Sequence, residues 1–341
     1  LGIAFAIIAC SSNNETIPAP EVDPDGDDGT TEVEFAKGAD IGWVTEYESK
    51  GYHFYNAKGE QRECTALMKE LGLNAIRIRV WVDPSKHGNW CNTADVVEKA
   101  KRAKELGMDV MIDFHYSDWW ADPAQQNKPA LWVGKNLGNL KSAIKDHTMS
   151  VLQALKEIGV IPKWVQVGNE IRPGMLWDED VALSGASYNV TEKDLKDAPA
   201  SATDKVVYPM NWANLGAFVT TGYDAVKSVF PDAIVIVHLD NGWDSGLFTW
   251  FFDELKKNGG KWDMIGMSLY PYWSRDAKEG YSSADAVITD CISNIKALSD
   301  KYNCDVMVVE TGMECADDNG KLASTSVLNC LLYTSPSPRD S

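Results

Sequence analysis

Two glutamates that end apolar segments are the residues of this chain best suited to chemistry. Glu170 ends the segment Trp164–Glu170 and is followed by the turn residues Arg172, Pro173 and Gly174. Glu310 ends a second segment of the same form, Asp305–Glu310. If both segments are parallel strands, the two carboxylates reach the same rim of a sheet. Such a pair supplies the acid/base and the nucleophile needed to cleave a sugar acetal.

Seven apolar segments alternate with helical segments and provide the elements that position these glutamates. The expected strands are Gly38–Trp43, Ala75–Val82, Asp109–His115, Trp164–Glu170, Ala233–Leu239, Asp263–Tyr270 and Asp305–Glu310. Gly72, Gly107 and Gly159 fit the position just after a helix, where left-handed backbone reverses the chain. Near-continuous apolar strands that alternate with helices predict a parallel sheet covered by helices.

The fold class predicted from this alternation is α/β, as a (β/α)8 TIM barrel. A doubly wound sheet would fit the same alternation. The barrel is preferred because polar residues gather at the C-terminal ends of nearly every strand, where barrel active sites are built. No GxGxxG or Walker signature indicates a nucleotide site. With seven expected strands, the barrel is predicted to be truncated before or within its eighth β/α unit.

Period-two alternation identifies the side chains that face the barrel interior. They are Ala75, Arg77, Arg79, Trp81, Asp113, His115, His238, Asp240, Ser268 and Tyr270. The two interior arginines need anionic or polar partners, because an unpaired buried charge is costly. Any one of these polar residues could be a satisfied core residue. Their convergence on one rim with both glutamates predicts a site.

Three aromatic segments are expected to wall an open groove. Residues 116–132 form a long polar loop with several tryptophans, and residues 171–208 form a longer one with Trp177 and Tyr188. Loops of this length are uncommon in compact domains unless they bind something. Tyr270-Pro-Tyr-Trp273 adds a third aromatic wall. Flat aromatic faces with polar edges suit sugar rings, so the groove is expected to hold several sugar units.

Composition limits the kinds of partner. The net charge of −18 makes a nucleic acid or an anionic bilayer an unfavourable partner, whereas a neutral polymer remains compatible. The 341 residues, 44% of them apolar, are enough for one large catalytic domain. Apart from Cys10 and Cys330 the chain has five cysteines, and no CxxC or Cys/His spacing suggests zinc. We therefore expect no metal among these residues.

The catalytic domain is expected at residues 36–329, with other kinds of segment on both sides. Residues 1–10 are predicted to be part of a lipoprotein signal, since Ile7-Ile8-Ala9-Cys10 resembles a bacterial lipobox and implies a lipidated Cys10. Residues 11–35 are predicted to be a flexible polar tether, and residues 330–341 a non-native tail. The expected location is exported, lipid-anchored to a bacterial envelope at the outer membrane or cell surface, or secreted.

Several motifs together are similar to glycoside hydrolase family 53. They are Gly38–Gly42, Arg77–Pro84, Asp113–Pro123, Gln166–Ile171, Gly174–Trp177, Ser268–Trp273 and Val309–Gly312. The resemblance covers roughly residues 36 to 328 and implies an endo-β-1,4-galactanase acting on the galactan of type I arabinogalactan in pectin. The family belongs to a clan of retaining (β/α)8 hydrolases that work by double displacement.

The resemblance implies roles for individual residues. Glu170 would be the acid/base and Glu310 the nucleophile, with carboxylates about 5–5.5 Å apart; a gap near 9 Å would indicate inversion. Arg79 beside Glu310 would favour its charged form, and an apolar wall would keep Glu170 neutral. The expected substrate-binding residues are Asn169, Arg79, His115, Asp118, Trp120, Trp177, His238, Asp240, Ser268 and Tyr270.

The expected partner is β-1,4-galactan, bound by a monomer that needs no cofactor. We expect no nucleic acid, and contact with a membrane only through a lipid on Cys10. The substrate-facing Trp of the eighth strand, and the structural calcium that some family members bind nearby, would belong to a C-terminal part beyond this sequence. Two alternatives remain open: another clan β-1,4-glycanase, such as a mannanase, cellulase or xylanase, or a surface glycan-binding lipoprotein with an impaired barrel.

Overall fold

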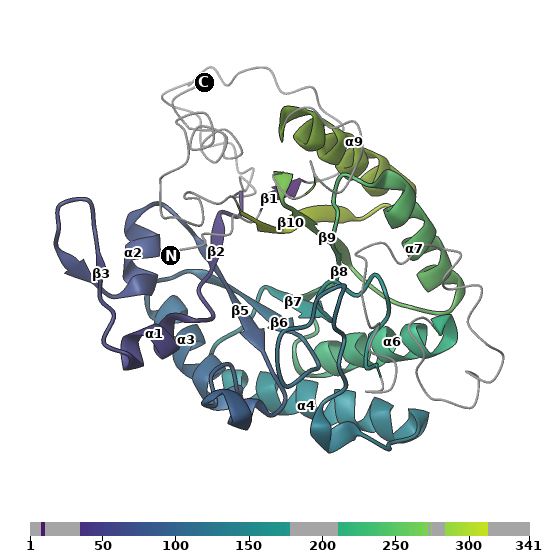
Figure 1. Cartoon of the computed structure of the whole chain (residues 1–341), viewed down its shortest axis with the longest axis horizontal. Helices are drawn as coiled ribbons and strands as arrows, with labels where there is room; N and C mark the ends of the chain where they lie inside the picture. Colours follow the sequence, from purple (N-terminus) through teal and green to yellow (C-terminus); the bar gives the residue numbers. More distant parts are fainter. Residues whose placement is uncertain (1–7, 11–34, 178–210, 272–273, 275–283, 313–341) are drawn as a thin grey trace.

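Seven parallel strands form the curved sheet at the centre of the computed structural model (Figure 1). The structure describes residues 8–10, 35–177, 211–271, 274 and 284–312. The parallel strands are β2 (Gly38–Asp40), β5 (Ala75–Val80), β6 (Asp109–Phe114), β7 (Trp164–Val167), β8 (Ile234–Leu239), β9 (Met264–Leu269) and β10 (Asp305–Thr311). All seven expected strands are confirmed, several of them shorter at one end than expected.

The strand order identifies the architecture as a (β/α) barrel. From β2 to β10 each strand pairs in parallel with the next one along the chain. A doubly wound sheet would instead reverse its order at a switch point. Among the described residues no pairing joins β2 to β10, and the expected eighth β/α unit lies outside them.

A short strand, β1 (Ile8–Cys10), pairs antiparallel with the free edge of β10. It belongs to the predicted signal segment, and the rest of that segment, nearly all of the predicted tether and the predicted tail lie outside the described residues. Within the part of the chain that the structure describes, no helix is both long and apolar enough to cross a bilayer.

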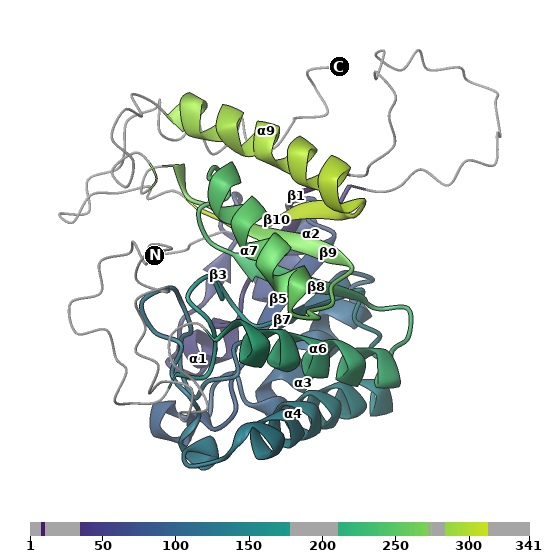
Figure 2. The ribbon, with the colours of Figure 1, turned by 90° about the vertical axis from the view of Figure 1, so that its right-hand side faces the viewer.

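The helices follow one another around the outside of the sheet (Figure 1; Figure 2). They are α1 (Val44–Ser49), α2 (Cys64–Glu70), α3 (Thr93–Glu105), α4 (Leu137–Glu157), α6 (Trp212–Val229), α7 (Ser245–Lys257) and α9 (Ala284–Tyr302). Short 3-10 turns lie at Pro84–His87 and Ala130–Trp132, and a hairpin at β3 (Phe54–Tyr55) and β4 (Gln61–Arg62). Gly72, Gly107 and Gly159 have φ of +89°, +64° and +68°, which confirms the left-handed residues expected after α2, α3 and α4.

Two separate apolar clusters fix which way the strand side chains point. The larger cluster packs outward-facing strand residues such as Ile76, Ile78 and Val80 against the helices. The smaller one fills the barrel interior with Ala36, Ala75, Met111, Trp164, Ile236, Met264, Met307 and Val309. Most of these interior residues lie toward the N-terminal ends of their strands. The polar interior residues are therefore confined to the C-terminal end of the barrel, as the alternation predicts.

One histidine in the helical layer has a buried ring nitrogen without a hydrogen-bond partner. His147 on α4 packs against the rings of Phe114 and Trp132, at centroid distances of 5.6 and 6.2 Å. Its Nε2 atom is shielded from solvent and has no hydrogen-bond partner. Burial lowers the pKa of His147 to about 4.

We predict that His147→Phe makes the protein more resistant to acid. In the unfolded chain this histidine takes up a proton near pH 6.5, but in the folded protein only near pH 4, so folding stability falls as the pH decreases between those values. At pH 4 the lowered pKa of His147 reduces the free energy of unfolding by about 2–3 kcal/mol. Urea unfolding at pH 7 and pH 4 should show a smaller loss of stability in the variant. Equal losses in variant and parent would contradict the prediction.

Candidate active site

Glu170 is placed by an irregular turn at the end of β7. Gly168 and Glu170 have φ of +83° and +48°, and both lie in the left-handed region. A Cβ atom at residue 168 would lie 2.5 Å from Cγ2 of Ile171, so the position requires glycine. The turn lets two consecutive side chains, Asn169 and Glu170, both reach the barrel interior. A glutamate in the left-handed region is a strained conformation of the kind that gathers at functional sites.

Glu310 is placed by a β-bulge in β10. Met307 and Val309 face the interior cluster, so strict alternation would point Glu310 outward toward the helices. The pairing with β9 shifts between Val308 and Glu310, which inserts one extra residue into β10. The bulge turns the Glu310 side chain back into the barrel, opposite Ser268.

The two glutamates face each other at short range. An oxygen of Glu170, an oxygen of Glu310 and a ring nitrogen of His238 all lie within 4.8 Å of one another. This close approach agrees with the short carboxyl separation of a retaining glycosidase, about 5–5.5 Å, better than with the wider gap of about 6.5–9.5 Å of an inverting one.

The same three residues are the one group among the described residues whose ligand atoms are close enough to hold a metal ion. Their atoms already have partners within the protein. Both His238 nitrogens are hydrogen-bonded, and Glu310 binds the Arg77 guanidinium. A metal ion bound to His238 would have to displace one of these contacts, so the arrangement favours proton transfer and nucleophilic attack by the carboxyl groups themselves.

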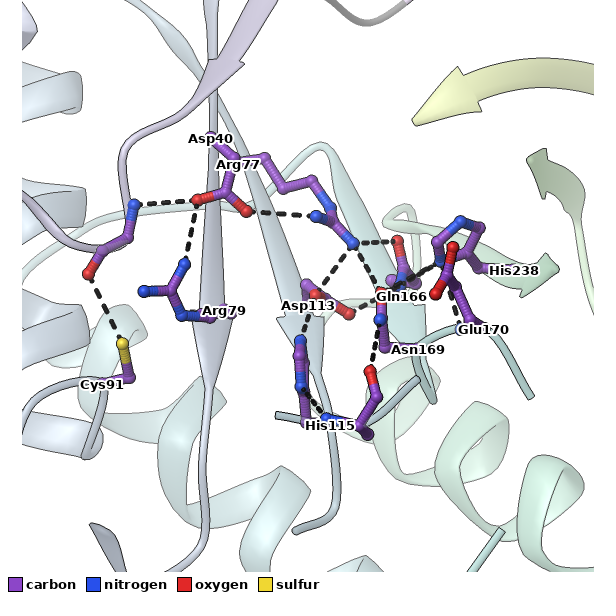
Figure 3. A network of polar contacts seen from close by, with 12 residues as sticks. Asp40, Arg77, Arg79, Cys91, Asp113, His115, Gln166, Asn169, Glu170 and His238 are labelled. Atoms are coloured by element: carbon purple, nitrogen blue, oxygen red, sulfur yellow. Dashed lines mark hydrogen bonds and ion pairs between the residues drawn. The ribbon is translucent and has the colours of Figure 1, made fainter. Parts of the chain in front are cut away.

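A buried guanidinium connects the site to four strands (Figure 3). Arg77 on β5 is 2% exposed. Its nitrogens lie 3.1 Å from Asp40, 2.9 Å from Asp113 and 2.7 Å from Glu310. Nη2 also donates to Gln166 Oε1 at 3.1 Å and Asn169 Oδ1 at 2.9 Å. Arg77 thereby holds Glu310 in place relative to β2, β6 and β7.

The charges of this network outweigh the cost of burying it. Burial alone would lower the pKa of Arg77, but the negative charges of Asp113, Glu310 and Asp40 raise it well above its ordinary value. Burial alone would raise the pKa of Asp113, yet Arg77 and His115 hold it below its ordinary value. Arg77 and Asp113 therefore stabilise each other's charged form.

Glu170 has the opposite environment to Glu310. The Glu170 side chain is buried, and Ser268 Oγ donates to its Oε1 at 2.6 Å. Burial, the charge of Glu310 and the charge of Asp240 raise the pKa of Glu170 well above its ordinary value. Glu310 instead forms an ion pair with Arg77 at 2.7 Å and accepts a hydrogen bond from the Tyr270 hydroxyl at 3.0 Å. The environment of Glu170 thus favours a protonated carboxyl, whereas Glu310 lies against a guanidinium.

The predicted place of Arg79 beside Glu310 is wrong, and Arg77 has that position. Arg79 lies 3.5 Å from Asp40, with its guanidinium 4.1 Å from the ring centre of Trp120. Arg77 lies two residues earlier on the same inward face, and its long side chain reaches up to the level of the glutamates. Arg79 therefore links the network to the aromatic loop.

His115 and Asn169 lie at the site, as predicted, but their described contacts are to the protein. His115 Nε2 donates to Asp113 at 2.9 Å, and its Nδ1 accepts the backbone N–H of Ala121 at 2.9 Å. Asn169 Nδ2 donates to the carbonyl of Ala121 at 2.8 Å. Both residues hold the third β/α loop against the barrel rim.

Two of the predicted binding aspartates also hold loops. Asp118 accepts the backbone N–H groups of Asp83 and Ala130 at 2.9 and 2.8 Å. Asp240 forms a two-point ion pair with Arg172 at 2.8 and 3.0 Å. Their oxygens bind backbone and arginine partners in the structure, and their role in binding substrate stays a prediction.

Three further residues that were predicted to bind substrate are enclosed in the structure, and that role stays a prediction. Trp177, His238 and Ser268 are 1%, 0% and 1% exposed. The Trp177 indole N–H donates to the Pro173 carbonyl at 3.1 Å, so this ring packs within the fourth loop rather than lining its surface. The part of the predicted aromatic walls at residues 178–208 and 272–273 lies outside the described residues.

The accessible part of the site is aromatic. Trp120 is 40% exposed, as expected of a groove residue, and Tyr270 is half-buried beside Glu310. Trp119, 38% exposed, was not predicted individually; it stacks on His87 with ring centres 3.8 Å apart. Gln166 was also missed, although its place on the same face as Trp164 could have identified it as an interior residue.

Comparisons with known proteins agree with this geometry. The model of glycosyl hydrolase family 53 matches residues 36–334. An arabinogalactan endo-beta-1,4-galactanase of Thermothelomyces thermophilus is 31% identical over 296 residues, which cover 85% of this chain and 77% of that protein.

Solved structures give the same result. One from a study of two fungal beta-1,4-galactanases has a TM-score of 0.67 and 30% identity, covering 84% of this chain and 76% of that one. The family 53 catalytic domain of Ignisphaera aggregans has a TM-score of 0.62 and 30% identity, and the match covers 78% of this chain and 65% of that one.

We predict that Arg77→Met destabilises the protein by about 3–5 kcal/mol, because it leaves three carboxylates without their buried counter-charge. The free energy of unfolding in urea at pH 7 measures this loss. The matched control is Arg62→Met, which removes an exposed arginine that also pairs with two carboxylates, those of Glu60 and Glu70. Its urea midpoint should change little. Equal shifts in both variants would show that Arg77 is not the centre of the network.

Proposed function

The chain belongs to glycosyl hydrolase family 53, and we propose that it cleaves β-1,4-galactosidic linkages within galactan, with retention of configuration. The observation that carries this proposal is the facing pair of Glu170 and Glu310, at short separation and in opposite protonation environments. The galactanase relatives support galactan as the substrate.

In the first step Glu310 acts as the nucleophile. Its carboxylate oxygen attacks the anomeric carbon while Glu170 gives its proton to the departing glycosidic oxygen. The bond to that oxygen breaks, the galactan fragment leaves as an alcohol, and a galactosyl ester forms on Glu310. Tyr270 and Arg77 hold the attacking carboxylate in place.

In the second step Glu170, now a carboxylate, acts as a base. It takes a proton from a water molecule, whose oxygen attacks the anomeric carbon and releases Glu310. Two inversions give net retention, and both glutamates return to their starting states. The cycle uses protein groups and water, with no cofactor.

The alternatives are weaker. A glycan-binding protein with an impaired barrel would have no need of two facing carboxyls, one with a raised pKa and one paired with an arginine. A mannanase, cellulase or xylanase would share this pair, but relatives at about 30% identity are named as galactanases. Lipidation of Cys10, export, a monomeric state and a calcium site near the end of the barrel stay predictions that rest on the sequence.

We predict that the protein releases galacto-oligosaccharides from potato galactan and little sugar from mannan, cellulose or xylan. NMR of the early products should show that the β-anomer forms first. Glu310→Ala should reduce the rate by about three orders of magnitude or more and retain galactan binding. Glu105→Ala, which removes an exposed glutamate on α3, is the matched control and should keep the parent rate. An unchanged rate in Glu310→Ala would remove Glu310 from the nucleophile's role.

A second prediction concerns the pH dependence of kcat/KM for galactan. Glu170 must be protonated to act as the acid, and its pKa is raised. The alkaline limb of the profile should therefore lie at a pH well above the ordinary pKa range of a glutamate side chain. Glu170→Gln should abolish this limb together with most of the activity on galactan. If the alkaline limb of the profile remains in Glu170→Gln, a group other than Glu170 is the catalytic acid.

A further inference from the structure

Two enclosed residues, Ser268 on β9 and His238 on β8, lie directly behind Glu170. Ser268 Oγ donates to Glu170 Oε1 at 2.6 Å. His238 Nε2 lies 2.8 Å from the same Ser268 Oγ. Both side chains are buried, so their interest lies in what they do to Glu170 rather than in contact with a sugar.

The position of the hydrogen on His238 follows from its other neighbours. The backbone N–H of Glu170 points at His238 Nδ1 at 3.3 Å, and the Gln166 amide nitrogen lies 3.0 Å from the same atom. A backbone N–H can only donate, so Nδ1 is the acceptor, even though Asn169 Oδ1 also lies 3.0 Å from it. Burial and the charge of Arg77 lower the pKa of His238 well below its usual range, so the ring is neutral. Its single hydrogen is therefore on Nε2.

This hydrogen sets the direction of the next hydrogen bond. His238 Nε2–H donates to Ser268 Oγ. The serine therefore donates its own hydroxyl hydrogen to Glu170 Oε1. Because Oε1 accepts this hydrogen, the proton of the neutral Glu170 carboxyl belongs on Oε2. The hydrogen bonds form a closed ring that starts at the Glu170 backbone N–H and ends at the Glu170 carboxyl.

We propose that His238 and Ser268 are positioning residues that hold Glu170 with its acid proton on Oε2, the oxygen directed at the leaving group. The proposal rests on the proposed function and assigns the two residues a role within it. Without the donor at Oε1, the carboxyl could rotate and carry its proton on either oxygen. Only one of these arrangements delivers a proton to the glycosidic oxygen.

The test compares two substrates in the full-length Ser268→Ala variant. Galactan has a poor leaving group that needs protonation, whereas 2,4-dinitrophenyl β-1,4-galactobioside has one that leaves without it. Both kcat/KM values report the step that forms the galactosyl ester. We expect a loss of about 10- to 100-fold on galactan and of less than about threefold on the dinitrophenyl substrate.

The pH profile provides a second readout. The Ser268 hydrogen bond lowers the pKa of Glu170 against the larger effect of burial, so its removal should move the alkaline limb of kcat/KM for galactan to higher pH. Ser268→Thr retains the hydroxyl and should restore both the rate and the limb. The matched control is Ser299→Ala, which removes a buried serine hydroxyl on α9 that has no hydrogen-bond partner.

Equal losses on the two substrates, or an unmoved alkaline limb, would overturn the proposal and indicate a direct substrate contact or a merely structural role. If thermal unfolding shows that Ser268→Ala does not fold, His238→Met is used instead; it removes the N–H that directs the Ser268 hydroxyl to Glu170, and the same split between substrates is required of it. If the parent protein itself fails to hydrolyse galactan, the proposed function is rejected. That outcome is distinct from a loss of activity in the variants alone.

Discussion

The Arg77 guanidinium lies 2% exposed among the carboxylates of Asp40, Asp113 and Glu310, which come from three different strands. Two arginines, Arg77 and Arg79, face three acidic side chains, so the network has one more acidic than basic group. Removing any of these ions from water is costly, and only their mutual attraction offsets that cost. The sheet must therefore bring β2, β5, β6 and β10 together before the site can exist.

The excess negative charge also explains why two glutamates of the same type behave differently. Arg77 binds Glu310 directly and is 2.7 Å from it, whereas no arginine contact to Glu170 is found among the described residues. An ionised Glu170 would add a further charge close to Glu310, in a place where burial already opposes ionisation. The pKa of Glu170 is raised for both reasons. The arrangement that fixes the nucleophile thus also keeps the proton on the acid.

The strands, the barrel rim and both glutamates could be predicted from the sequence because apolar runs and their final residues have a regular period. The orientation of Glu310 could not, since strict alternation from Met307 points it outward and only the bulge returns it. Arg77 and Arg79 share one face, and the sequence does not show which of them reaches the carboxylates. Enclosure of His238 and Ser268 depends on how neighbouring strands pack, which periodicity alone does not reveal.

The protonation states of His238, Ser268 and Glu170 depend on one another. A positively charged His238 would carry hydrogens on both nitrogens, and its Nδ1 could no longer accept the backbone N–H of Glu170. The nearby Arg77 guanidinium opposes that charge, so the same ion that stabilises Glu310 also keeps the histidine neutral. A neutral histidine in turn gives its one hydrogen to Ser268 and leaves the hydroxyl hydrogen to Glu170. Arg77 therefore acts on both catalytic glutamates. It contacts Glu310 directly, and together with burial it keeps His238 neutral, so that the Ser268 hydroxyl is directed at Glu170.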